Sequence, residues 1–228
     1  MPDEADRFLF TLAPIITLVA TFSVFVALPI GEPVTIWGTE ITLHLTDMNV
    51  ALLYVLAIAG IDVFGVIIGG WASNSKYAVL GSLRTCAQLI SYEIPMGFAV
   101  VGVVMLAQSM SLVTIVEAQA DLWNVVYQPI GFLVFFIAGM AEAQRIPFDL
   151  PEAEGDLGAG YHTEYSGMRF SLFIMSEYLI MVFLSALTVI LFFGGWNPLF
   201  LPLPPMVWFL LKTSFSLCLF MCFRFTFP

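Results

Sequence analysis

Charged residues are scarce in this sequence of 228 residues: only 11% are Asp, Glu, Lys or Arg, and 60% are hydrophobic. Soluble domains contain about 25% charged residues, so the mean hydropathy of +0.97 excludes an ordinary soluble domain. Basic residues are especially few, with 7 Lys and Arg against 17 Asp and Glu and a formal net charge of -10. A chain this acidic repels nucleic acid, and we exclude that class of partner.

Cysteine and histidine are too few and too scattered to predict a cofactor site. Of the 3 cysteines, Cys218 and Cys222 are one helical turn apart in an apolar segment, where we expect small buried side chains. His44 and His162 are far apart in the sequence and lack the spacing of metal ligands. Glycine-rich nucleotide motifs and CxxC pairs are absent from the sequence. We expect the chain to bind no cofactor or metal and to carry no catalytic redox centre of its own.

Long apolar runs dominate the sequence instead. A membrane-spanning helix needs about 20 mostly apolar residues. We predict an all-α, polytopic membrane protein with a single transmembrane domain over residues 1–228. The six spans are expected near residues 8–29, 48–70, 86–107, 122–141, 169–194 and 205–225.

The few cations indicate how these spans are oriented. The connectors 30–47, 108–121 and 195–204 contain no Lys or Arg. Six cations fall at the opposite ends of the spans: Arg7, Lys76, Arg84, Arg145, Arg169 and Arg224. The positive-inside rule places these ends, and both chain termini, in the cytoplasm. We expect a multi-pass protein of the bacterial inner membrane, with an organelle-encoded inner-membrane protein as the alternative.

Four ionisable side chains fall inside the predicted spans, namely Asp62, Glu93, Glu177 and Lys212. At 1.5 Å per residue, the three acids lie roughly 12 to 14 Å from the cytoplasmic ends of their helices. A charge at such a depth costs on the order of 3 kcal/mol or more and usually has a function. We predict a proton route from these residues and Glu142, which we expect at the cytoplasmic end of the fourth span. The alternatives are protonated acids that merely join helices and, for Lys212, a side chain that extends to the membrane surface.

An acid-rich connector follows Glu142. Residues 141–165 read AEAQRIPFDLPEAEGDLGAGYHTEY and contain two prolines and three glycines. This composition predicts a shaped cytoplasmic loop, over about residues 142–168, and not a helix. Its candidate site residues are Arg145, Asp149, Glu152, Glu154, Asp156 and Glu164. An ordinary solvated loop is the simpler interpretation.

Several motifs resemble one family of membrane proteins. They are GSLRTCAQLISYEIPMG, RIPFDLPEAEGDLGAGYHTEYSGMRF, SEYLIM and GGWNP. Together they are similar to the H-subunit family of respiratory complex I, the NADH-quinone oxidoreductase, whose mitochondrial member is called subunit 1. The resemblance covers nearly the whole chain, and PFDLPEAE followed by EYSG is a specific combination. Ala143 and Gln144 depart from it, because relatives often carry Thr and Asn there.

The resemblance extends to the order of the helices. The six spans resemble the second to seventh helices of the family, without its first and last. We therefore expect a fragment, a split-gene product or an incomplete sequence.

The resemblance implies that the chain is one subunit of a proton-pumping enzyme complex, a translocase of the respiratory chain. In this family the acidic loop faces a quinone chamber, and buried carboxylates lead from the chamber toward antiporter-like subunits. Matched to this sequence, the carboxylates are Glu142, Glu93, Glu177 and Asp62, and Lys212 fits the seventh helix of the family. Quinone is then the substrate, while NADH, FMN and iron-sulfur clusters are expected in partner subunits. The implied partners are the peripheral quinone-module subunits, the membrane-arm subunits and lipid.

Three other interpretations remain open. The chain could be the membrane subunit of a related hydrogenase or ferredoxin-linked complex, although PFDLPEAE and EYSG favour complex I. It could be a stand-alone proton-coupled transporter, although the sequence shows no paired inverted repeats. It could also be a non-functional fragment.

Overall fold

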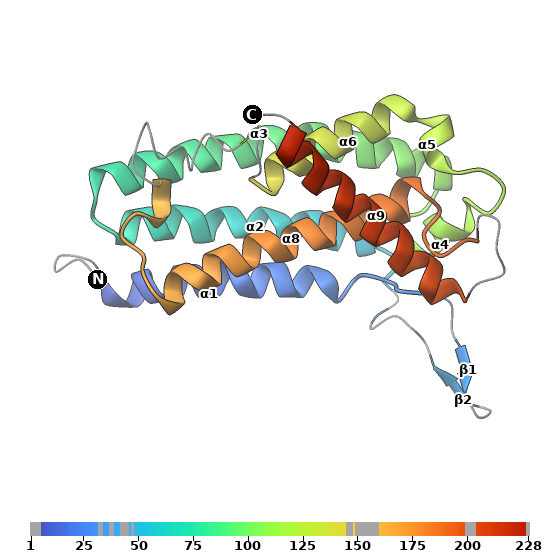
Figure 1. Ribbon diagram of the computed structural model, residues 1–228, viewed down its shortest axis with the longest axis horizontal. Helices are drawn as coiled ribbons and strands as arrows, with labels where there is room; N and C mark the ends of the chain where they lie inside the picture. Colours follow the sequence, from blue (N-terminus) through green and yellow to red (C-terminus); the bar gives the residue numbers. More distant parts are fainter. Residues whose placement is uncertain are drawn as a thin grey trace.

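The chain is helical almost throughout. The computed structural model describes residues 6–31, 34–36, 39–41, 46, 48–144, 148, 160–198 and 204–226. The helices are α1 (Arg7–Phe25), α2 (Ala51–Ala72), α3 (Lys76–Ala107), α4 (Leu112–Glu117), α5 (Asn124–Tyr127), α6 (Pro129–Glu142), α8 (Met168–Phe192) and α9 (Pro205–Thr226), with a 3-10 turn η1 (Gly160–His162). One small antiparallel hairpin pairs β1 (Val34–Ile36) with β2 (Thr39–Ile41). Long helices lie side by side along the long axis of the molecule (Figure 1).

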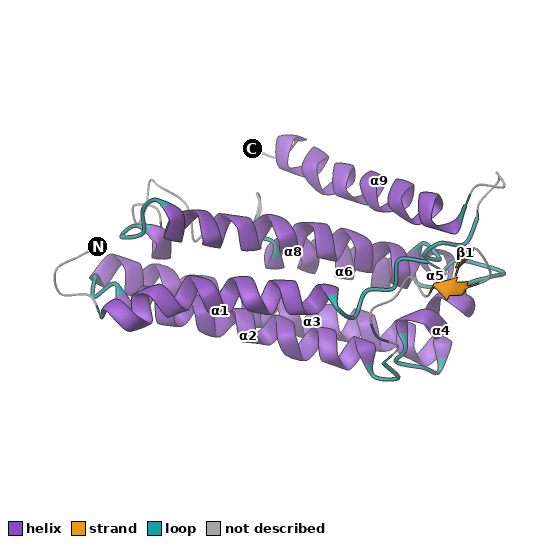
Figure 2. Cartoon of the chain, turned by 90° about the horizontal axis from the view of Figure 1, so that it is seen from below, coloured by secondary structure: helices purple, strands orange, loops and turns teal. Residues whose placement is uncertain are grey.

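Five helices in the described part of the chain are long and apolar enough to cross a membrane: α1, α2, α3, α8 and α9. The prediction of an all-α polytopic membrane protein is confirmed. α8 is the most enclosed of the five helices, because 72% of its most apolar 18-residue stretch is buried. By contrast, α9 lies outside the rest of the bundle (Figure 2). Cys218 and Cys222 are exposed on α9, so the expectation that they are buried is wrong for this chain.

The segment predicted as a fourth span, residues 122–141, is divided in the structure. It contains the four-residue α5 and the 14-residue α6, which meet at Pro129. A proline disfavours helical geometry in the residue before it, and Gln128 has φ -131 and ψ 64. α6 is therefore only about 21 Å long, shorter than the roughly 30 Å hydrocarbon core. It ends part-way along α3 and not at the end of the bundle (Figure 1).

α3 begins earlier than the sequence predicts. It starts at Lys76 and contains 32 residues, so Arg84 lies within the helix and not in a connector. Neither Lys nor Arg opposes helical geometry, and the chain turns just before, at Asn74, whose φ is 48°. The N-terminal ends of α1, α3 and α8 lie at one end of the bundle (Figure 1). Arg7, Lys76 and Arg169 stand at these ends, while the direction of the bundle across the membrane stays a prediction.

Glycines let the first helices approach closely. A methyl group added to Gly65 of α2 would overlap the side chain of Thr17 on α1, and one added to Gly70 would overlap Ser82 on α3. Small residues allow this contact between backbones in membrane helices. α2 is thereby held between α1 and α3, which fixes where its single acid, Asp62, lies.

Candidate functional site

Three acids from three helices meet inside the bundle. Asp62 belongs to α2, Glu93 to α3, and Glu142 is the last residue of α6. A carboxylate oxygen of Glu93 lies 3.4 Å from the position of a methyl group added to Gly60, so the side chain of Glu93 packs against α2. Asp62 and Glu93 are both close enough to act electrostatically on Glu142. We call Asp62, Glu93 and Glu142 the carboxylate cluster.

Glu142 lies in the interior of the bundle, whereas the sequence predicts it at the cytoplasmic end of a span. Its side chain is only 6% exposed, because the short α6 ends inside the bundle. Glu142 is one of the residues around a small cavity whose lining is apolar and includes Phe135, Ile180 and Leu184. The cavity offers about 20 Å³, enough for about one water molecule.

Two oxygens of the carboxylate cluster are buried without a hydrogen-bond donor among the described residues. They are Oδ1 of Asp62 and Oε2 of Glu142. Buried polar atoms in native proteins are nearly always satisfied, by protein or by water. Ionisable groups that share such a space exchange protons among themselves and titrate as a set.

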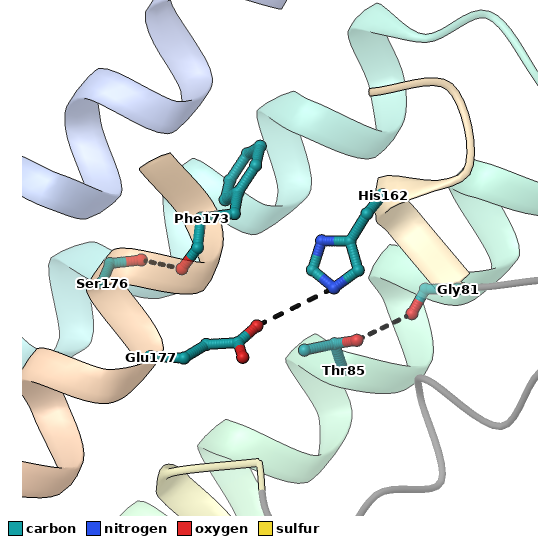
Figure 3. A network of polar contacts seen from close by, with 6 residues as sticks. All are labelled: Gly81, Thr85, His162, Phe173, Ser176 and Glu177. Atoms are coloured by element: carbon teal, nitrogen blue, oxygen red, sulfur yellow. Dashed lines mark hydrogen bonds and ion pairs between the residues drawn. The ribbon is translucent and has the colours of Figure 1, made fainter. Parts of the chain in front are cut away.

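Glu177 belongs to a second group, which the sequence did not predict. Its Oε1 lies 3.8 Å from Nε2 of His162, and both side chains are at least nine-tenths buried. Figure 3 shows the two side chains pointing toward one another across the space between α8 and η1. The imidazole is packed against aromatic rings, with ring centroids 3.7 Å away at Tyr161 and 5.9 Å away at Phe173. We call these two residues the His162–Glu177 pair.

The His162–Glu177 pair is positioned by a contact between backbones. A methyl group added to Gly81 of α3 would lie 2.8 Å from the carbonyl carbon of Gly160, so only glycine allows η1 to sit this close to α3. Gly160 has φ 61°, a left-handed conformation that favours glycine. His162 has no spacing signal in the sequence. The one available sign was its place in the acidic connector.

Tyr165 fixes the segment that follows η1. Its ring stacks on Phe10 of α1, with centroids 3.9 Å apart and an interplanar angle of 2°, and its hydroxyl donates to the Gly69 carbonyl at 3.4 Å. Burial raises the pKa of the Tyr165 phenol above its usual value, an effect that outweighs the nearby positive charge of Arg169. The hydroxyl therefore stays protonated and can act as a donor.

Lys212 is not brought to the acids. Its ammonium donates to the carbonyls of Phe193 at 2.8 Å, Gly195 at 3.0 Å and Asn197 at 2.8 Å, and lies 4.7 Å from the centre of the Trp123 ring. Phe193 is the C-cap residue of α8 and lies more than four turns beyond Glu177, about 24 Å along the helix axis. Lys212 thus caps the carbonyl end of α8, where the helix dipole favours a cation.

The remaining predicted residues belong to the acidic loop. Glu164 is partly exposed and follows η1. Arg145, Asp149, Glu152, Glu154 and Asp156 lie outside the described residues. Within the described ranges, no three His, Cys, Asp or Glu side chains are grouped as metal ligands would be.

Comparison with known proteins identifies the family. A family model described as NADH dehydrogenase matches residues 1–228. An H subunit of the NADH-quinone oxidoreductase of Rhizobium meliloti is 72% identical over 228 residues, which is 100% of this chain and 70% of that protein. The chain belongs to the H-subunit family of NADH-quinone oxidoreductase. The resemblance inferred from its motifs is confirmed.

Other relatives in the H-subunit family match this chain along its whole length. An H subunit from Geobacter sulfurreducens is 53% identical and is covered over 68% of its length. The H subunit of Anoxybacillus flavithermus is 50% identical and is covered over 66% of its length. Membership in this family agrees with the five apolar helices and makes this a multi-pass membrane subunit of the complex I type.

Proposed function

We propose that the chain is the membrane subunit of a proton-pumping NADH-quinone oxidoreductase in which a quinone chamber meets a proton route. The observation that supports this most directly is the convergence of Asp62, Glu93 and Glu142 inside the bundle. Isolated buried charges are costly in a membrane, whereas a coupled set of acids holds a proton at modest cost and passes it between members. The cluster suits a relay and not a redox reaction.

The His162–Glu177 pair supplies a second step of the proposed route. It lies where η1, the end of the acidic loop, packs on α3, and Glu177 projects from the enclosed helix α8. The pair therefore connects the loop to the interior of the bundle. Lys212 has no part in this version of the route, because it caps the far end of α8.

The loop acids belong to the proposed chamber. We place Arg145, Asp149, Glu152, Glu154, Asp156 and Glu164 against bound quinone at the cytoplasmic face of a bacterial inner membrane. Peripheral subunits would complete the chamber and carry FMN and iron-sulfur clusters, which deliver electrons from NADH. Membrane-arm subunits would receive the signal from the carboxylate cluster. This chain then contributes shape, charge and a proton route to the enzyme.

A comparison of two Glu→Gln changes tests the proposal. Glu142→Gln keeps the shape of the side chain but removes its titration. In membrane vesicles that contain the assembled complex, NADH-driven quinone reduction and proton uptake should both fall on the order of tenfold or more, since proton-transfer groups contribute at least this much. Glu117→Gln is the matched control, because Glu117 is exposed at the end of α4. Wild-type rates of reduction and pumping in Glu142→Gln would refute the proton route.

A further inference from the structure

The side chain of Gln88 on α3 bonds to two segments, the end of α6 and the acidic loop. Its Nε2 donates to the carbonyl of Ala141 at 3.1 Å and to the carbonyl of Phe148 at 2.6 Å. A side-chain amide has two N–H groups, so each carbonyl can receive one of them. Ala141 lies at the end of α6, directly before Glu142, and Phe148 lies in the acidic loop. One side chain therefore bridges the loop and the helix end that carries a member of the carboxylate cluster.

Tyr92 holds the same point of the loop through its ring. It lies one turn after Gln88 on α3, so the two side chains share a face of the helix. The rings of Tyr92 and Phe148 meet edge to face, with centroids 5.1 Å apart and an interplanar angle of 63°. Such aromatic pairs add about 0.5–1.5 kcal/mol beyond their buried area. Phe148 is thus held twice by α3, at its backbone and at its side chain.

The neighbours of these contacts are members of the carboxylate cluster. Glu93 follows Tyr92 on α3, and Glu142 follows Ala141 on α6. The Ala141 carbonyl also accepts from the backbone N–H of Gln144, which closes the helix end. A shift of Phe148 would therefore act on the peptide before Glu142 and on the turn of α3 before Glu93. This single contact therefore adjoins two of the three clustered acids.

We propose that Gln88, Tyr92 and Phe148 form a latch that transmits the position of the acidic loop to the carboxylate cluster. Gln88 is a positioning residue in this latch: it ties Phe148 of the loop to the helix end that carries Glu142 and touches neither quinone nor a transferred proton. This inference rests on the proposed function and deepens it by naming the physical link between the loop and the cluster. Breaking the latch should leave the acids in place but separate quinone chemistry from proton transfer.

The test compares two glutamines whose Nε2 atoms each donate to two carbonyls; Gln119 also accepts from the backbone N–H groups of Asn124 and Gly194, so its loss is the more severe control. Gln88→Leu removes both hydrogen bonds of the latch. Gln119→Leu is the matched control, because Nε2 of Gln119 also donates to two carbonyls, of Ile115 at 3.0 Å and Ile190 at 2.8 Å, far from the acids. Both changes lower stability, but only Gln88→Leu should lower the number of protons pumped per quinone reduced, by about two- to thirtyfold, the range to which typical coupling energies convert.

Each outcome of this comparison is decisive. The ratio is measured in vesicles that contain the assembled complex, from NADH oxidation and dye-reported acidification. If Gln88→Leu pumps as many protons per quinone as the wild type, the latch is refuted and the proposed function is not. The same holds if Gln119→Leu lowers this number as much as Gln88→Leu does. A wild-type complex that neither reduces quinone nor pumps protons refutes the proposed function and the latch with it.

A second set of variants covers a Gln88→Leu chain that fails to assemble. Tyr92→Leu removes the ring contact and leaves both hydrogen bonds, so a milder loss of the pumping ratio is expected. Phe148→Leu removes the same contact from the other side. Because residues in one contact are not independent, the double variant should lose no more than either single one. Additive losses, or wild-type ratios in both, would overturn the latch.

Discussion

Replacing Lys212 by Met separates a structural role from a role in proton transfer. The ammonium of Lys212 donates to three carbonyls, those of Phe193, Gly195 and Asn197. Met has a similar length but cannot donate. The change leaves the end of α8 and the following turn without this donor, while the carboxylate cluster and the His162–Glu177 pair are untouched.

The size of the effect follows from those contacts. Hydrogen bonds between membrane helices contribute about 0.6–1.7 kcal/mol each, so losing three costs about 2–5 kcal/mol. The contact with the Trp123 ring adds about 0.5–2 kcal/mol, and relief from burying a cation offsets part of the loss. With a net change of about 3 kcal/mol, Tm should fall by about 6–12 °C, at 2–4 °C per kcal/mol for a chain of this size.

Thermal unfolding of the purified complex, followed by a thiol-reactive dye and by loss of NADH-quinone activity on heating, measures this change. Lys212→Arg is the control, because it keeps the charge and the donors and should lose less. The pumping ratio of Lys212→Met should match that of the wild type at low temperature. An unchanged Tm together with fewer protons pumped per quinone would refute the capping role and support a role of Lys212 in proton transfer.

Two further changes probe the residues around η1. His162→Asn removes the imidazole that faces Glu177, so NADH-driven quinone reduction should fall on the order of tenfold; an unchanged rate would contradict the proposed second step. Tyr165→Phe tests the raised pKa of the phenol. Since the unfolded chain loses this proton first, at about pH 10, folding stability should decline above that pH in the wild type, and less so in Tyr165→Phe, as measured by unfolding at about pH 8 and about pH 11. An equal loss of folding stability between about pH 8 and about pH 11 in the wild type and in Tyr165→Phe would contradict the raised pKa of Tyr165.

The helical, membrane-spanning class could be predicted because apolar run length alone determines it. The boundaries of the spans depend on single residues that break or extend a helix, and the length of an apolar run does not reveal these residues. Pro129 divides the predicted fourth span, and a helix-compatible Lys76 to Arg84 stretch extends the third. Neither feature changes the overall hydropathy.

The acids of the candidate site could be chosen from the sequence, but their grouping could not. The depth of Glu93 was counted from a helix start near Arg84, whereas α3 begins at Lys76, and Glu142 comes near Asp62 and Glu93 because α6 stops inside the bundle. His162 reaches Glu177 through a contact between Gly81 and Gly160, which are far apart in the chain. The sequence suggested that Lys212 is a buried charge paired with an acid, whereas its ammonium donates to three backbone carbonyls. Such long-range contacts leave no periodic trace in the sequence.

The length of α3 has a mechanical consequence. With 32 residues it is about 48 Å long, which exceeds the hydrocarbon thickness of about 30 Å. A helix longer than the bilayer tilts, and the tilt follows the thickness of the surrounding lipid. Gly81, Gln88 and Glu93 all belong to this one helix, so a change in its tilt would move the contact with η1, the contact with Phe148 and the Glu93 carboxylate together. The thickness of the surrounding bilayer is therefore expected to influence where all three residues lie.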